Sequence, residues 1–309
     1  MDKGLIKTSD KKPVLALAAS SLAADFLASL DVKEISKKAY KNGLDRFLSW
    51  MEGARIEQPD RVSILAFKKA LVEVGLSANT VNSYLVAVKR FFAYLEGIRK
   101  YPNIARDVKG LRQPRKHLRE SLTIDQVREV LSIINRTTER GKRDYALINL
   151  MARTGLRTIE VVRADTGDIK QEGGEALLYV QGKGRDEKDE FVLLTEATLK
   201  PLRVYLLAHG AVALDQPLFS SLSDRNRGGR LTTKTIRKII KDKLREVDIN
   251  SPKLSAHSLR HFFATQSLKA GAPIIQVKEA LRHSSIETTQ KYIHNLERIE
   301  KGAERYIEF

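Results

Sequence analysis

Cysteine is absent from this chain of 309 residues, which excludes disulfide bonds, thiolate zinc sites, iron–sulfur clusters and thiol catalysis. No apolar run approaches the ~20 residues that a membrane-spanning helix needs, so we expect no membrane partner. A Walker loop and a dinucleotide-binding fingerprint are also missing, and Gly182-Lys183-Gly184 is too short to cradle phosphates. Residues 14–24 are similar to the core of a signal peptide, but helical spacing continues to Leu30. This favours an amphipathic first helix and a cytoplasmic protein.

Metal-binding patterns are equally scarce. His257 and His261 have a ligand-like spacing on a helix, but the glutamate that zinc hydrolases carry beside the first histidine is missing. Paired carboxylates that would hold two magnesium ions are not evident in the sequence. We therefore expect no cofactor and no metal. If the protein acts on phosphate, we expect metal-free chemistry.

Positive charge is the most prominent property of what is present. The chain has 55 Lys and Arg against 38 Asp and Glu, a formal net charge of +17. With 42% hydrophobic and 30% charged residues, the composition is that of a globular protein and not of a disordered chain. The charge favours a polyanionic partner such as nucleic acid, although many basic proteins have none. The length predicts two domains.

The first hundred residues show helical periodicity of their apolar side chains. Helices are predicted over 15–30, around 40–51 and over 64–74, and a fourth begins after an N-cap at Ser77 and ends at Gly97. We expect a compact helical bundle over residues 15–110, which follows an N-terminal tail at 1–14.

A basic segment follows the bundle. Residues 98–119 hold eight bases against Asp107 alone, and Pro102, Pro114 and Gly110 interrupt the segment. We interpret 111–119 as an extended basic linker and expect phosphate contacts, because a solvated loop explains only one or two such bases. The candidate DNA-binding residues are Arg99, Lys100, Arg112, Arg115, Lys116 and Arg119.

The second domain, residues 120–309, is predicted to be mostly helical with a small sheet. Thr123 and Gln126 form a capping box before an apolar run. Two β-rich segments, 177–182 and 190–194, flank a turn and predict an antiparallel hairpin. The other predicted helices lie near 143–153, 196–208, 232–247, 258–270, 274–281 and 295–306.

Two arginines stand in contexts that are unusual for a surface. Arg157 follows a turn glycine at the start of a helix, and Arg260 precedes two phenylalanines on a helix that must be largely buried. Metal-free phosphoryl transfer needs fixed cations, an acid and a nucleophile, and arginine binds phosphate with a planar fork. Taken singly, such arginines are structural more often than catalytic.

The joint pattern resembles the tyrosine recombinase (phage integrase) family, in the simple two-domain form of Xer-like recombinases. Six positions agree in order and approximate spacing over about 140 residues of the second domain. The matching stretches are Thr154–Glu160, Gly182–Gly184, His257–Thr265, Leu281–His283 and Thr288–Tyr292. The resemblance implies a mainly α fold with a small antiparallel β-sheet. The implied fold comprises a helical-bundle core-binding domain and a mixed α/β catalytic domain.

The resemblance assigns roles to these residues. Tyr292 would attack the scissile phosphodiester and form a 3′-phosphotyrosine, while Lys183 would protonate the departing 5′-oxygen. Arg157 and Arg260 would bind the non-bridging oxygens. Because a phenol with a pKa of ~10 is mostly protonated at neutral pH, cationic neighbours must help Tyr292 to ionise.

Histidines and one carboxylate complete the site that the resemblance implies. His257 would assist proton transfer and His283 would hydrogen-bond the phosphate. Glu160 would orient the cationic cluster, and His261 would brace its helix. Each residue also has a structural interpretation when taken alone, as a packed, capping or solvated side chain.

The function implied is site-specific DNA recombination through a Holliday junction, without ATP or metal. The expected partners are a double-stranded recombination site, three further copies of the chain in a homotetramer and a possible accessory or partner recombinase. The expected location is cytoplasmic, at the nucleoid. The alternatives are a tyrosine-type DNA topoisomerase and a non-catalytic DNA-binding regulator with the same fold.

Four features depart from the family pattern or stay open. Arg282 stands where the family usually has glycine, and we expect it to contact DNA or a neighbouring subunit. Ala164 and Thr166 replace larger apolar residues. Residues 185–190 are more acidic than the family's turn, which puts a DNA contact of this hairpin in doubt. The helix at 296–306 would dock on a neighbouring protomer or pack at home.

Overall fold

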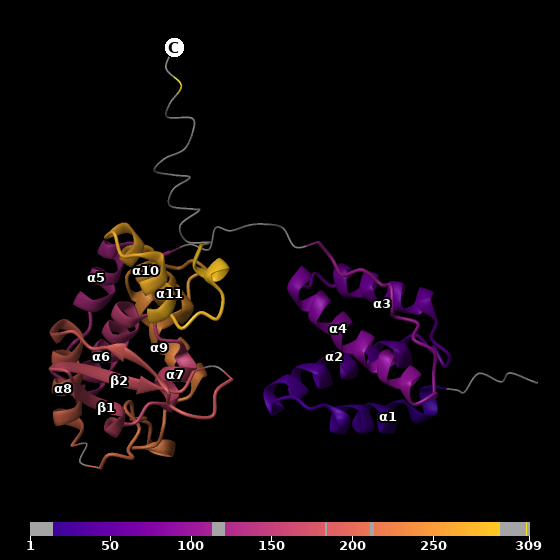
Figure 1. Cartoon of the computed structure of the whole chain (residues 1–309), viewed down its shortest axis with the longest axis horizontal. Coiled ribbons are helices and arrows are strands. Elements are labelled where there is room, and N and C mark those ends of the chain that lie inside the picture. The colour runs from indigo at the N-terminus through magenta and orange to yellow at the C-terminus, as the bar shows by residue number, and fades with distance from the viewer. Residues whose placement is uncertain (1–14, 113–120, 183, 211–212, 291–306, 308–309) are drawn as a thin grey trace, which may run out of the picture. The chain divides into compact units, whose positions relative to one another are not determined.

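Two compact units make up the chain, and they divide after Arg115. The computed structural model describes residues 15–112, 121–182, 184–210, 213–290 and 307. Within these residues, no helix is both long and apolar enough to span a bilayer. Figure 1 shows helices in the described part of the first unit, whereas the second combines helices with a small sheet. The predicted fold class, mainly α with a small antiparallel sheet, is confirmed.

The described residues of the first unit form a bundle of four helices. They are α1 (Leu15–Ser29), α2 (Glu34–Gly53), α3 (Arg61–Glu73) and α4 (Ala78–Gly97). The predicted N-cap is confirmed, because the Ser77 hydroxyl accepts a hydrogen bond from the Thr80 backbone N–H. Helix α4 presents an apolar face to α2, and the aromatic rings of Phe47, Phe67 and Phe92 meet in the core. Burial of these rings, together with that of aliphatic side chains such as Leu44 and Ile64, stabilises the unit.

Residues 98–112 fold back onto this bundle. The Asn82 side chain makes two hydrogen bonds to the Leu111 backbone, at 2.7 and 2.9 Å. The Lys109 carbonyl accepts a hydrogen bond from Lys68, and the Tyr101 hydroxyl donates to the Pro59 carbonyl at 2.7 Å. The basic segment is therefore held by the helices up to Leu111, and most of the predicted linker lies outside the described residues.

The second unit contains seven α-helices and three strands among its described residues. The helices are α5 (Ile124–Ser132), α6 (Glu139–Thr154), α7 (Thr158–Arg163), α8 (Glu196–His209), α9 (Thr233–Glu246), α10 (Ala256–Lys269) and α11 (Ile274–Ala280). The strands are β1 (Ile169–Glu172), β2 (Glu175–Val180) and β3 (Glu190–Leu193). The capping box of Thr123 and Gln126 is confirmed. The helix predicted at 295–306 lies outside the described residues.

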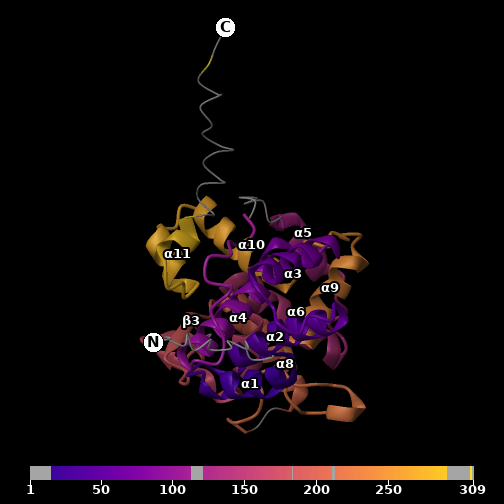
Figure 2. The same ribbon diagram turned by 90° about the vertical axis from the view of Figure 1, so that its right-hand side faces the viewer.

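The sheet is antiparallel in the order β1-β2-β3, with Leu178 opposite both Ile169 and Val192. Strand β1 was not expected, because its sequence Ile-Lys-Gln-Glu is short, largely exposed and without apolar alternation. The buried face of β2 and one side of α8 join the core around α6, most of whose residues are buried. Helices α10 and α11 lie side by side in both Figure 1 and Figure 2.

Candidate active site

Gly155 ends α6 and sets the geometry of the candidate active site. Its backbone is left-handed (φ +63°), a conformation that glycine adopts without the Cβ penalty. A Cβ at this position would lie 2.7 Å from the Phe263 ring and 2.8 Å from the Leu281 side chain. Glycine therefore allows the chain to turn into α7 directly against α10 and the end of α11.

Arg260 on α10 is buried beneath this turn, with 1% of its surface exposed. Its guanidinium donates to the Gly155 carbonyl at 2.7 Å and also to the Leu281 carbonyl. The carbonyl groups at the ends of α6 and α11 thus each accept a hydrogen bond from the Arg260 guanidinium. Arg260 itself is buried, although only five of the fourteen residues of α10 are, and the helix ends at 155 and 281 meet at this side chain.

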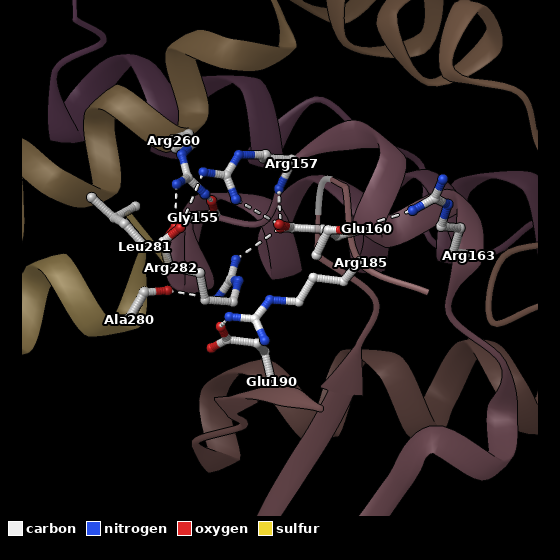
Figure 3. Close-up of polar contacts among 11 residues, drawn as sticks. Gly155, Arg157, Glu160, Arg163, Arg185, Glu190, Arg260, Ala280, Leu281 and Arg282 are labelled. Carbon is white, nitrogen blue, oxygen red and sulfur yellow. Dashed lines mark hydrogen bonds and ion pairs between the residues drawn. The ribbon is translucent and has the colours of Figure 1, made fainter. Parts of the chain in front are cut away.

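Arg157 is the N-cap residue of α7 and is 24% exposed in its side chain. Its guanidinium contacts Glu160 at 2.7 Å, and its backbone N–H donates to the other carboxylate oxygen at 2.7 Å. A further guanidinium N–H donates to the Arg282 carbonyl at 3.3 Å. Figure 3 shows the side chains of Arg157, Arg260 and Arg282 gathered around Glu160 and the Leu281 carbonyl.

Glu160 is fully buried, and its carboxylate joins two arginines. Arg282 donates to it at 2.8 Å, at the same oxygen that accepts from the Arg157 backbone N–H. Burial raises the pKa of Glu160, but the charge and hydrogen bond of Arg282 and those of Arg157 outweigh it, and the net shift is downward. The carboxylate is therefore ionised near neutral pH and can fix both arginines.

Arg282 was expected to contact DNA or a neighbouring subunit, and this expectation is wrong for its side chain. The side chain is 2% exposed and points into the molecule, toward Glu160. The sequence identified it as an unusual residue, but its partner lies 122 residues earlier in the chain. No pattern in the sequence reveals such a long-range pair.

His283 follows this turn directly and is half-buried. One of its ring nitrogens lies 2.9 Å from the hydroxyl of the buried Thr289. Burial lowers its pKa to about 4, and the charges of Arg260, Arg157 and Arg282 add to the shift. The imidazole is therefore neutral at pH 7, which suits a hydrogen bond to an incoming anion.

His257 and His261 lie one turn apart at the start of α10. Their rings meet edge to face, with centroids 4.7 Å apart. The charge of His257 also contributes to the lowered pKa of His283, so the two histidines lie in one electrostatic neighbourhood. Among the described residues, no group of three or more His, Asp and Glu side chains could hold a metal ion.

Lys183 and Tyr292 lie outside the described residues. Ion pairs hold the described residues between β2 and β3. Arg185 contacts Glu190 at 2.8 Å, and Lys188 contacts Asp165 at 2.7 Å and also Asp168. Two of the four acids in residues 185–190, Asp189 and Glu190, therefore pair with Arg185, and Lys188 joins the hairpin to the segment before β1.

The candidate DNA-binding residues divide into two groups. Arg99, Lys100 and Arg112 are described and exposed, whereas Arg115, Lys116 and Arg119 lie outside the described residues. Arg106, a further base of the segment, pairs with Glu96 at 2.7 Å. The exposed bases are available to solvent, and Arg106 is engaged on the bundle.

Comparisons with known proteins match both units. Residues 120–298 match the phage integrase family, and residues 23–97 match the phage integrase N-terminal SAM-like domain. The tyrosine recombinase XerD of Listeria innocua is 30% identical over 288 residues, which cover 89% of this chain and 94% of that protein. XerC of Herpetosiphon aurantiacus is 30% identical over 266 residues and 83% of each chain. In fold, the chain is similar to the XerH recombinase bound to its difH substrate. That likeness has a TM-score of 0.73 and 22% identity, and covers 99% of this chain and 100% of that one.

Proposed function

The chain belongs to the phage integrase family and is a tyrosine recombinase, and we propose that it exchanges DNA strands through a covalent 3′-phosphotyrosine at Tyr292. One observation carries the proposal. Arg157 and Arg260 come from distant segments of the chain. Both donate to backbone carbonyl groups of residues 281–282, directly before the neutral His283. Such a cluster suits a phosphodiester, because both the ground state and the transition state carry negative charge on non-bridging oxygens.

The first step forms one bond and breaks one. The Tyr292 oxygen attacks phosphorus and the bond to the 5′-oxygen breaks, which leaves a 3′-phosphotyrosine and a free 5′-hydroxyl. The phenolic proton passes to a neighbouring base, for which His257 is the candidate, and Lys183 protonates the leaving oxygen. Attack by a 5′-hydroxyl from another strand reverses the step. One phosphoester replaces another, so the exchange needs no ATP.

The charge at the phosphate is balanced by the described residues. The Arg157 side chain is partly exposed and can offer N–H donors to a non-bridging oxygen. His283, neutral in the free protein, gains an anionic neighbour when phosphate arrives, which raises its pKa and strengthens its hydrogen bond. Arg260 contributes positive potential from a fixed, buried position.

We further propose that the active species is a homotetramer on two double-stranded sites. Strand exchange would proceed through a Holliday junction at the nucleoid, with an accessory protein or partner recombinase where the site requires one. The DNA-binding part of this proposal is supported by the net charge of +17 and by the exposed Arg99, Lys100 and Arg112. Phosphate contacts by these bases predict binding that weakens steeply with salt.

Covalent capture on DNA tests the proposal. Wild-type protein and Tyr292→Phe are each mixed with sheared DNA from the source organism, denatured and recovered, and the attached DNA is sequenced. We expect adducts with the wild type alone, concentrated at one site, while both proteins retain noncovalent binding. Adducts with Tyr292→Phe would refute the nucleophile.

A second assay separates recombination from its alternatives. Two labelled duplexes that carry the captured site are incubated with wild-type protein, and hybrid products are resolved on a gel. Recombination predicts hybrids and four-way junctions. Relaxation of supercoiled DNA without hybrids would indicate a topoisomerase, and binding without adducts would indicate a regulator.

A further inference from the structure

The turn after α11 has a residue in a conformation that usually selects glycine. Leu281 caps the helix, and Arg282 follows with a φ of +53°. The Arg282 N–H donates to the Glu279 carbonyl at 2.8 Å and the His283 N–H to the Lys278 carbonyl at 3.1 Å. This is the Schellman arrangement, whose left-handed position strongly favours glycine because a Cβ is disfavoured there.

Other arginines of the chain occupy a similar position. Arg55 and Arg99 each follow a helix C-cap with a φ of +55°, and both are exposed. Strain alone therefore gives Arg282 no special status. The difference lies in the side chain, because only Arg282 of these three is directed into the protein, with 2% of its side chain exposed.

Arg282 is linked to Arg157 in two ways, one direct and one through Glu160. Its backbone carbonyl accepts a hydrogen bond from the Arg157 guanidinium at 3.3 Å. Its guanidinium donates a hydrogen bond to one oxygen of Glu160 at 2.8 Å. The same oxygen accepts a hydrogen bond from the Arg157 backbone N–H at 2.7 Å. The Arg157 guanidinium donates to the other oxygen of Glu160 through a single nitrogen, at 2.7 Å. An arginine beside an unshared carboxylate prefers a two-bond fork.

We propose that Arg282 is a positioning residue that shares the Glu160 carboxylate and so keeps the charge and donors of Arg157 available for phosphate. A lone Arg157–Glu160 pair carries no net charge, whereas the triad with Arg282 carries one positive charge. In a buried site this difference acts at low dielectric and is weakly screened. The inference rests on the proposed function, since it assigns Arg157 to the scissile phosphate.

The arrangement also distinguishes positioning from direct contact. The Arg282 guanidinium donates to the Ala280 carbonyl at 2.6 Å as well as to Glu160, and it is covered by protein. With 2% of the side chain exposed, it has almost no surface with which to bind DNA in this structure. Its effect on the phosphate is indirect and passes mainly through Glu160 and Arg157, while its charge also helps to lower the pKa of the neighbouring His283. We expect a change in cleavage rate with little change in DNA affinity.

Single-turnover cleavage with excess enzyme tests the proposal. The substrate is a duplex oligonucleotide with the site recovered by covalent capture, nicked so that the cleaved strand diffuses away, and DNA affinity is measured separately. Three variants separate the contributions. Arg282→Gly removes both the charge and the left-handed penalty, Arg282→Asn removes the charge at a residue type that tolerates this backbone, and Arg282→Lys keeps the charge. Arg55→Gly is the matched control, with the same backbone change at an exposed arginine.

We expect Arg282→Gly and Arg282→Asn to cleave about 10- to 100-fold more slowly with DNA affinity within about threefold, because a transition-state donor is misplaced. Arg282→Lys should recover most of the rate, and Arg55→Gly should match the wild type. In a Glu160→Gln background, Arg282→Gly should cause little further loss, since both act on one partner.

Wild-type-like cleavage by Arg282→Gly overturns the inference and leaves the proposed function intact. Equal losses in the Lys, Gly and Asn variants also overturn it, because they would reveal a purely structural role. A wild type that forms no adduct overturns the proposed function and the inference together. If Glu160→Gln does not fold, the cleavage rate of Arg282→Lys decides whether Arg282 acts through its charge.

Discussion

Replacement of Gly155 by alanine should weaken both the fold of the second unit and the active site. Alanine at φ +63° carries a left-handed penalty of about 1–2 kcal/mol. Its Cβ would lie 2.7 Å from the Phe263 ring and 2.8 Å from Leu281, both held in packed surroundings, and such overpacking costs about 1–3 kcal/mol. The expected loss in free energy of unfolding is therefore about 2–5 kcal/mol. Because the Gly155 carbonyl holds Arg260, cleavage should fall by at least about 10-fold.

Gly210 provides a matched control. It is also a left-handed helix C-cap, with a φ of +69°, but a Cβ there would have no neighbour within 4 Å. Gly210→Ala should cost only the backbone penalty of about 1–2 kcal/mol and leave cleavage unchanged. The difference between the two variants measures the packing contribution at Gly155.

Thermal unfolding can be followed with two signals, one of which reports the first unit alone. The single tryptophan, Trp50, belongs to the first unit, so its fluorescence reports that unit, whereas far-ultraviolet circular dichroism reports helices of both. For a domain of this size, roughly 2–4 °C of Tm is lost per kcal/mol. Equal destabilisation by Gly155→Ala and Gly210→Ala would refute the packing argument. A shift of the Trp50 transition would show that the effect is not confined to the second unit.

Two further predictions concern His283 and Asn82. The pKa of His283 is about 4 in the folded state against an ordinary 6.5, so the unfolded chain binds more protons between these values. Stability should fall as the pH drops from about 6.5 toward 4, and His283→Gln should flatten this part of a urea-denaturation series; an unchanged slope would contradict the assignment. Asn82→Ala removes both hydrogen bonds to Leu111, at an expected cost of about 1–2 kcal/mol. Limited proteolysis near residue 111 should accelerate, and resistance equal to wild type would count against the docking of the basic segment.

Local signals made much of the fold predictable from the sequence. Ser77 and Thr123 have side chains that satisfy free backbone N–H groups, and they mark helix starts by short-range chemistry. Strand β1 escaped prediction because Ile169–Glu172 pairs with β2 through backbone groups, while its side chains show no buried face. Such a strand is specified by its neighbour and not by its own pattern.

The residue types of the candidate site were predictable from the sequence, but the contacts between these residues were not. Arg157 and Arg260 stood out by context, but their contacts depend on carbonyl groups more than 20 residues away along the chain. The burial of Arg282 is of the same kind, because it follows from Glu160 and from the tertiary path of α11. The roles proposed for Lys183 and Tyr292 stay predictions.

The long-range contacts at the arginine cluster also bear on synthesis. Arg157 and the Arg282 carbonyl that holds it are 125 residues apart. At ~5–20 residues per second, a ribosome takes roughly 6–25 seconds to make that interval. Until residue 282 has left the exit tunnel, Glu160 lacks one of its two arginines and Arg260 lacks its Leu281 carbonyl. Tyr292 comes later still. A nascent chain that ends before residue 282 therefore lacks the assembled cluster, and under the proposed mechanism we expect it to be unable to cleave DNA.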